Sequence, residues 1–323
     1  MGVTLEEVDQ QLATFAEEHE MMRVNALLTS VVAISVSLLS ALPAAAAPFT
    51  FNTGAVTNLM ASASRPESAG KFEIESADDF FLSSPTSITS ATFTGLLTGG
   101  ATTANIGEVR IEIYRVFPAD SDVARTSGPP NFSTPQVPTR VNSPSDVEFD
   151  DRDTAPPPGN LKFTTTLLNS SFTALNSVQP GGIHPLPGLT TGGDKAITGQ
   201  EVEFAVTFTT PFSLPPDHYF FVPQVEITTA SGEFLWLSGT RPLVPSPFPP
   251  GVTDLQSWTR DDVSANNLAP DWARIGTDIV GGATPPTFNA AFSLAGQTIP
   301  EPATWWLVSL GMVIVIGWPR PRV

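Results

Sequence analysis

Alternation of apolar and polar residues is the clearest pattern along this chain. In EVRIEI, Val109, Ile111 and Ile113 fall on one side of an extended segment, and the charged residues between them fall on the other. The segment QEVEFAVTFT, residues 200–209, repeats this pattern with valine and phenylalanine on one side and mainly glutamate and threonine on the other. Each segment predicts a β-strand with one buried face and one solvated face.

Further strands are predicted from segments rich in β-branched and aromatic residues. They are 71–75, 79–82, 88–97, 161–168, 218–228, 233–239 and 287–296. Pro223 lies inside one of them and predicts an edge position or a bulge, because proline cannot donate to a β-ladder. About nine strands with short polar turns predict an all-β domain over residues 47–298, a β-sandwich of jelly-roll type.

Two stretches between these strands do not have a strand pattern. Residues 118–160 are dense in proline, aspartate and serine, and residues 241–250 read RPLVPSPFPP. Both predict loops, of which the first is a long insertion. A short helix is predicted near Thr253–Trp258.

The C-terminal 25 residues differ in character from the rest of the chain. Pro300, Glu301 and Pro302 precede an uncharged apolar run, 303–318, and the chain closes with two arginines, Arg320 and Arg322. As a helix, roughly 16 residues would span about 24 Å, slightly less than the ~30 Å hydrocarbon core of a bilayer. Tryptophans at both ends of the run and the basic tail favour a transmembrane helix. The alternative is a buried C-terminal helix or strand of the domain.

This arrangement resembles the PEP-CTERM sorting signal of Gram-negative bacteria, which consists of a Pro-Glu-Pro motif, a transmembrane helix and a short basic tail. The resemblance covers only residues 299–323. It implies that Pro300, Glu301 and Pro302 are a processing motif, near which an exosortase, a membrane-embedded cysteine protease-transpeptidase, cuts the chain. The sequence departs from the family in its tail, where prolines separate two arginines instead of a tighter arginine cluster.

The N-terminal region predicts export. Arg23, the apolar run 24–42 and the alanines at 44–47 fit a signal peptide over residues 21–46, cut after Ala46 or, alternatively, after Ala44 or Ala45. Residues 1–20 carry six acids and no lysine or arginine, which is the wrong charge for the start of a signal peptide. Translation is therefore expected to begin at Met21 or Met22. The alternative is a cytoplasmic extension, with 24–46 retained as an anchor.

Composition excludes several kinds of reactive site and of binding partner. The chain has no cysteine, which excludes disulfides, thiolate metal sites and a cysteine nucleophile. Its formal net charge is −17, and loss of residues 1–46 leaves 26 acids and 14 bases, a net −12. Such a surface repels nucleic acid and anionic lipid, so no nucleic-acid partner is expected.

No catalytic motif is apparent. Beyond the leader only His184 and His218 remain as histidines, and both are interpreted as residues that make ordinary hydrogen bonds. The chain has no nucleophile elbow, zinc-protease motif or phosphate-binding glycine loop, so neither a catalytic residue nor a cofactor is predicted.

Acidic residues gather in two regions. One group is Asp146, Glu148, Asp150, Asp151 and Asp153, and the other is Asp261, Asp262, Asp271 and Asp278. Oxygen ligands at this density could hold a structural calcium ion, although no known calcium-loop pattern is present. The alternative is a solvated acidic loop.

Two tryptophans in polar surroundings are candidate carbohydrate contacts. Trp258 in QSWTRDD and Trp272 in APDWARIG could each present a flat face to a sugar ring. The alternative is burial in the core, which is the usual place for tryptophan and is expected for Trp236.

Three functional hypotheses follow. The first is a non-enzymatic, exported protein of the cell surface or extracellular matrix, with exosortase and the secretion machinery as partners during sorting. It would be held transiently in the inner membrane by its C-terminal helix. The second is a carbohydrate-binding module for exopolysaccharide. The third is a glycan hydrolase with two carboxyl groups that face each other across a cleft at ~5–10 Å.

Overall fold

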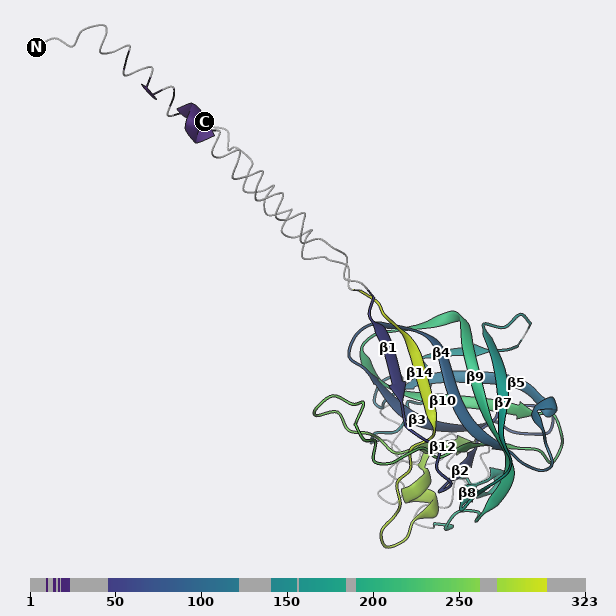
Figure 1. The fold of residues 1–323 in the computed structure, drawn as a ribbon. Coiled ribbons are helices and arrows are strands. Elements are labelled where there is room, and N and C mark those ends of the chain that lie inside the picture. The colour runs from purple at the N-terminus through teal and green to yellow at the C-terminus, as the bar shows by residue number, and fades with distance from the viewer. Residues whose placement is uncertain are drawn as a thin grey trace, which may run out of the picture. The chain divides into compact units, whose positions relative to one another are not determined.

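Two open β-sheets are built from the residues between Ala46 and Ile299 in the computed structural model of the chain (Figure 1). Met1–Ala45 and Pro300–Val323 form a separate unit. The structure describes residues 10, 14–15, 17, 19–23, 46–121, 141–155, 157–183, 190–261 and 272–300. The predicted signal peptide before Ala46, and Glu301, Pro302 and the run 303–318, lie outside the described residues.

The first sheet has eight strands. They are β1 (Pro48–Asn52), β2 (Ala61–Ala63), β4 (Thr86–Leu97), β7 (Leu161–Ala174), β8 (Ser177–Val178), β9 (Ile197–Leu214), β11 (Phe234–Leu237) and β14 (Phe292–Thr298). The long strand β4 organises this sheet, because it pairs with β9 on one edge and with β14 and then β11 on the other. β1 pairs with β14, β7 with β9, and β2 with β11 and β8.

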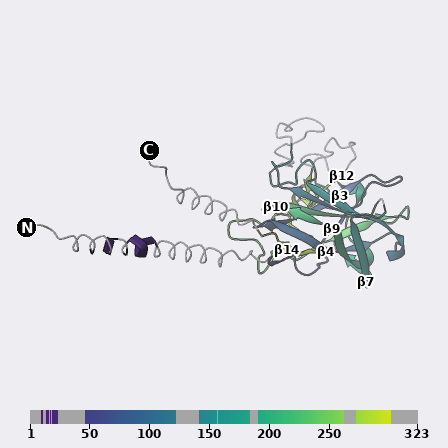
Figure 2. The ribbon, with the colours of Figure 1, turned by 90° about the horizontal axis from the view of Figure 1, so that it is seen from above.

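The second sheet has six strands in the order β13-β12-β3-β10-β5-β6. Their bounds are β3 (Ile74–Leu82), β5 (Ile106–Arg115), β6 (Asp150–Asp153), β10 (Asp217–Ile227), β12 (Trp258–Asp261) and β13 (Ala273–Arg274). Every pairing in this sheet is antiparallel. The two sheets pack face to face, as Figure 2 shows, so the prediction of an all-β, sandwich-like fold is confirmed.

Short helical turns connect some strands. They are the 3₁₀ turns η1 (Thr103–Asn105) and η2 (Pro180–Gly182) and one π-helical turn, η4 (Ile275–Val280). The helix predicted near Thr253–Trp258 is wrong. Residues 251–257 run as irregular backbone, and Trp258 begins β12.

An aromatic core fills the space between the sheets. Phe93 and Phe204 of the first sheet stack at 4.8 Å, and Phe292 stacks across the interface on Phe221 of the second sheet at 5.0 Å. Trp236 is 1 % exposed, as expected, and its indole N–H donates to the carbonyl of Ala291. Alternation in the sequence therefore identified the inward face of both sheets.

The predicted solvated face is correct for β9 and correct only in part for β5, where Glu108 and Arg110 are half-buried. On β9, Glu201, Thr207 and Thr209 remain at least partly exposed. On β5, Glu112 is only 3 % exposed, although it faces away from the core. The outer face of the second sheet carries its own apolar cluster, which includes Trp258 and Trp272.

Other sequence predictions need adjustment. The long insertion 118–160 contains a strand, β6, which pairs with the edge of β5. The segments 71–75 and 79–82 contribute to one strand, β3, and not to two. Pro223 lies two residues beyond Phe221, where the ladder between β10 and β3 ends, so it has a paired strand on one side only.

The first and last strands of the domain lie side by side. β1 and β14 are antiparallel neighbours, with Pro48 opposite Gln297. The amide of Ala47 donates to Thr298 Oγ1 at 2.9 Å, and the amide of Thr298 donates to the carbonyl of Ala47 at 2.8 Å. The chain therefore enters and leaves the sandwich at one place. The described residues contain no helix with the length and hydrophobicity that a membrane crossing needs.

Candidate functional site

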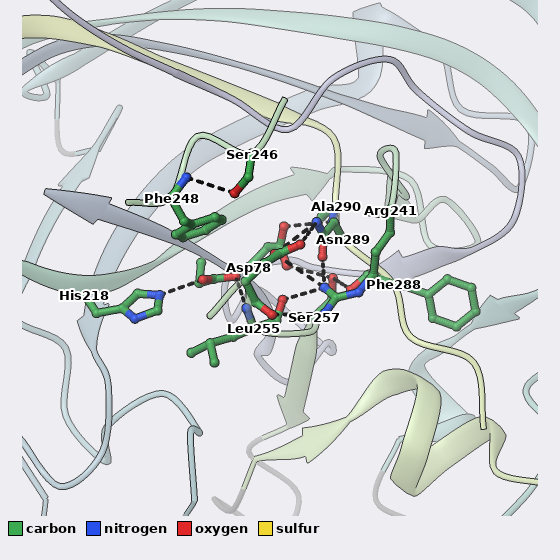
Figure 3. A network of polar contacts seen from close by, with 12 residues as sticks. Asp78, His218, Arg241, Ser246, Phe248, Leu255, Ser257, Phe288, Asn289 and Ala290 are labelled. Carbon is green, nitrogen blue, oxygen red and sulfur yellow. Dashed lines mark hydrogen bonds and ion pairs between the residues drawn. The ribbon is translucent and has the colours of Figure 1, made fainter. Parts of the chain in front are cut away.

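The most unusual chemistry in the described residues is a pair of consecutive aspartates in β3. Asp78 and Asp79 are each 1 % exposed, and because neighbouring residues in a strand point to opposite faces, they enter two different environments. Figure 3 shows the polar network around them, which joins β3 to His218 of β10, Arg241 and the segments 254–257 and 288–290.

Asp78 faces the inner side of the second sheet and makes two hydrogen bonds. Its partners are the amide of Ala290 at 2.9 Å and the hydroxyl of Ser257 at 3.0 Å. Ser257 Oγ also lies 3.0 Å from the carbonyl oxygen of Phe288, yet a hydroxyl has only one hydrogen to donate. Burial raises the pKa of Asp78 well above its usual value. A protonated Asp78 satisfies all these atoms, because it donates to Ser257 while Ser257 donates to Phe288.

Asp78→Asn is expected to change the free energy of unfolding at pH 7 by less than about 1 kcal/mol. The new amide would donate to Ser257 and still accept from Ala290, which reproduces the bonds of the protonated acid. Asp78→Ala leaves the Ala290 amide without this acceptor and should cost about 1–3 kcal/mol. Chemical denaturation of the two variants measures the difference. Equal destabilisation by both would show that Asp78 acts as a carboxylate.

Asp79 points to the outer side of the sheet and is bonded to His218. Its Oδ2 lies 2.6 Å from His218 Nε2, and its Oδ1 accepts the amide of Leu255 at 3.1 Å. Burial raises the pKa of Asp79 well above its usual value and lowers the pKa of His218 to about 4. Both shifts favour uncharged side chains, so the pair holds one shared proton and no net charge.

Arg241 fastens the irregular segment before β12 to this network. Its guanidinium donates to the carbonyls of Asp254 and Leu255 at 3.0 and 2.7 Å, and also to the side-chain oxygen of Asn289. Asn289 in turn donates to both oxygens of Asp254, at 3.1 and 3.2 Å. These bonds join Arg241 and Asn289 to residues 254–255, and the contacts of Leu255 and Ser257 with the two aspartates attach the same segment to β3.

The network does not have the layout of a glycosidase. A hydrolytic carboxylate pair must face one substrate bond across a cleft. Asp78 and Asp79 lie on opposite faces of one strand, and each is almost fully enclosed. A second carboxylate pair, Glu75 and Glu112, is also buried, at 4 and 3 % exposure. No observation in the described residues therefore favours the hydrolase hypothesis.

Comparison with known proteins gives no relative. No family model, curated protein or solved structure matches this chain.

A small pocket opens beside the Asp79–His218 pair. It has a volume of about 260 Å³ and is lined by the aromatic rings of Phe49, Phe81 and Phe248, by Pro247 and Pro249, and by Ser83, Ser84, Thr86 and Thr298. His218 packs edge-on against Phe81, and its ring centroid lies 5.8 Å from that of Phe248. The pocket combines aromatic walls with hydroxyl groups and has no charged residue in its lining.

A second groove lies on the outer face of the first sheet. It has a volume of about 370 Å³ and is bordered mainly by serine, threonine and alanine of β4, β7, β9 and β14, with one charged residue, Lys162. Neither this groove nor the aromatic pocket is lined by a carboxylate.

The two tryptophans predicted to contact sugars are buried. Trp258 is 1 % exposed and Trp272 is 2 % exposed, and both belong to the apolar cluster on the outer face of the second sheet. The indole of Trp272 donates to the carbonyl of Ser145 and stacks against Arg260, whose guanidinium carbon lies 4.5 Å from the ring centroid. Neither ring offers a face to a sugar, because neighbouring segments cover both.

The acidic residues considered for calcium are spread over several environments. Asp150 pairs with Arg152, and Asp278 pairs with Arg274 at 2.7 Å. Among the described residues, no group of three or more acids or histidines has the geometry of a metal site. Asp262, Asp271 and His184 lie outside the described residues, as do Glu301 and Pro302 of the sorting motif, whereas Pro300 is exposed directly after the domain.

One feature of the sequence indicates that an acid is buried in the strand that carries Asp78 and Asp79. Two consecutive acids stand immediately before an apolar FFL sequence in a predicted strand, and such a position forces at least one acid toward an apolar surface. The identity of their partners could not be read from the same signal.

Proposed function

We propose that this chain is an exported β-sandwich protein, sorted to the cell surface or extracellular matrix by its C-terminal signal. The observation that carries the proposal is the order of features at the end of the chain. Pro300, Glu301 and Pro302 precede an uncharged apolar run and a basic tail, and an export signal is predicted at the other end. Exosortase, the secretion machinery and, before processing, the membrane are the partners in this proposal. Jelly-roll connectivity, a transmembrane helix over 303–318 and a non-enzymatic role belong to the same proposal.

The place where the chain enters and leaves the domain supports this arrangement. A cut after Ala46 would start the mature chain at Ala47, whose nitrogen already donates to Thr298. The last hydrogen bond of the domain joins the Ile299 amide to the carbonyl of Pro85 at 2.7 Å, one residue before the sorting motif. Both cleavage steps would therefore occur outside the folded sheets, and neither would remove a strand.

Mass spectrometry of both termini, on protein recovered from cell fractions of the native host, tests the proposal. A mature N-terminus at residues 45–47 and a C-terminus near 300–302 are expected in the envelope or medium. Glu301→Ala should leave the tail uncut in the membrane fraction, whereas the exposed Gln297→Ala serves as a matched control and should be processed normally. Intact full-length protein in the cytosol of the host would contradict the proposal.

A second candidate function is binding of a neutral carbohydrate, at a place different from the one predicted. The pocket formed by Phe49, Phe81 and Phe248 offers aromatic faces for the apolar side of a sugar ring. Ser83 and Ser84 supply hydroxyl groups at the same opening. Its volume of about 260 Å³ suits one ring of a polymer, and the uncharged lining favours a neutral polysaccharide.

Phe81→Leu is expected to abolish retardation of the protein in affinity gels that contain a neutral polysaccharide. The change removes the aromatic face but keeps an apolar side chain, so folding should be retained. Phe172→Leu is the matched control, because Phe172 is also half-buried but lies on β7, outside the pocket lining. Absence of retardation of the unmodified protein across neutral polysaccharides would eliminate this second function.

A further inference from the structure

A long strand edge borders the first sheet at β7. This strand has 14 residues, and within the described parts of the chain it pairs on one side only, with β9. Figure 2 places β7 at the periphery of the sandwich. An unpaired edge presents a row of backbone N–H and C=O groups, which is a template for another strand.

The first half of β7 lacks most of the features that keep an edge strand from pairing with another chain. The strand contains no proline, and Lys162 is its only charged residue. No further Asp, Glu, Lys or Arg occurs until Asp194. Register shifts, which bend a strand, interrupt the second half after Leu167, whereas Leu161–Leu167 pairs in unbroken register with β9. The straight, weakly protected segment is therefore Leu161–Leu167.

We propose that Leu161–Leu167 pairs antiparallel with the same segment of a second copy of this chain, across a two-fold axis. A two-fold pairing that uses all seven residues must be centred on the middle one, Thr164. This register places Lys162 of one copy opposite Thr166 of the other. It also places Leu161 opposite Leu167.

Charge complementarity supports this register. Lys162 and Thr166 point to the outer face of the sheet, where the neighbour of Thr166 on β9 is Glu203. In the dimer, Lys162 would lie two strand spacings, about 10 Å, from Glu203 of the second copy, with only a threonine between them. Long side chains can close this gap, and the two-fold axis produces two equivalent pairs of Lys162 and Glu203. No like charges are brought together in this row.

Exposed apolar surface at the edge of β7 also supports the two-fold pairing. Leu167 lies on the inward side of the strand and yet is 49 % exposed, because no strand follows beyond the edge. In the dimer it would lie next to Leu161 of the second copy, which is 2 % exposed and belongs to the core. Pairing would therefore extend the core of each copy across the axis and cover Leu167 in both copies.

Single cysteines give a direct test, because the chain has none of its own. Thr164→Cys places two thiols next to each other at the axis, since directly opposed side chains have Cβ atoms about 4.5–5.5 Å apart. Thr173→Cys is the matched control, on the same strand and also exposed, and its two copies would be separated by about 60 Å. In the purified full-length protein in mild detergent, a short thiol crosslinker should produce dimers from Thr164→Cys and not from Thr173→Cys.

Charge exchange tests the register. Lys162→Glu faces Glu203 of the second copy and should raise the dimer dissociation constant about tenfold or more, measured by light scattering coupled to size exclusion. The double variant Lys162→Glu/Glu203→Lys should restore dimerisation. A monomeric mass for the unmodified chain, equal crosslinking at both cysteine positions, or crosslinks only to other proteins would each overturn the proposal.

Discussion

Replacement of Arg260 by methionine is expected to lower the free energy of unfolding by about 3–5 kcal/mol, the range for loss of one partner of a buried ion pair. Arg260 is 8 % exposed and lies in β12, on the outer face of the second sheet and directly opposite Glu75 of β3. Its guanidinium binds both carboxylate oxygens of Glu75, with the second bond at 3.0 Å, and contacts the hydroxyl of Tyr114 at 3.0 Å. It is the central cation of a nearly enclosed cluster.

The electrostatics of this cluster explain the size of the effect. Burial would raise the pKa of Glu75, but the charge and hydrogen bonds of Arg260 outweigh burial and lower it. The neighbouring Glu112 behaves in the opposite way, because burial and the charge of Glu75 raise its pKa well above the usual value. These opposite shifts favour the ionised form of Glu75 and the protonated form of Glu112 beside the guanidinium of Arg260. Without Arg260, the charge on Glu75 would be buried without compensation.

Chemical denaturation of two further variants checks this interpretation. Glu75→Gln/Arg260→Met should recover part of the lost stability, because no buried charge remains without a partner. Arg115→Met is the control, since Arg115 is 29 % exposed and its ion pair with Asp120 should be worth less than about 1 kcal/mol. If Arg260→Met were no more costly than Arg115→Met, the ion pair with Glu75 would not be what holds β12 to β3.

The pH dependence of stability is expected to change in opposite directions when either member of the Asp79–His218 pair is removed. Between about pH 4 and 6.5 the unfolded chain holds one proton on this pair, mainly on histidine, whose usual pKa is 6.5. The folded pair also holds one proton, because burial raises the pKa of Asp79 and lowers that of His218 to about 4. With equal proton numbers in both states, the intact pair contributes no pH dependence in this window.

Removal of either residue leaves one titrating group, which binds a different number of protons in the folded and unfolded states. In Asp79→Asn, the remaining His218 is neutral when folded and protonated when unfolded, so stability relative to the unmodified protein should rise by about 3 kcal/mol from pH 4 to 6.5. In His218→Gln, the remaining Asp79 is protonated when folded and ionised when unfolded, so relative stability should fall over the same window. Unfolding free energies measured at several pH values give both slopes. Slopes of the same sign would contradict the shared proton.

Alternation in the sequence determined which side of each long strand faces the core. Val202, Phe204, Val206 and Phe208 of β9, and Val109, Ile111 and Ile113 of β5, are all buried as their pattern predicted. A period of two follows from the geometry of a single strand, so the information lies within a few neighbouring residues. The Pro-Glu-Pro motif and its apolar run are equally local, and the proposal for sorting depends on them alone.

The tertiary structure decided what covers the outer faces. The pattern of β5 predicted a wet outer side, but Glu112, Trp258 and Trp272 are buried on this face. The segment 141–149 lies over it, because its carbonyls at Ser145 and Asp146 accept hydrogen bonds from Trp272 and Arg260. The aspartate network and the pocket beside it likewise depend on the tertiary structure. His218 and Asp79 are 139 residues apart in sequence, and Arg260 and Glu75 are 185 apart. Such contacts are chosen by the packing of whole strands, because the energy of a buried charge depends on partners that no local pattern specifies.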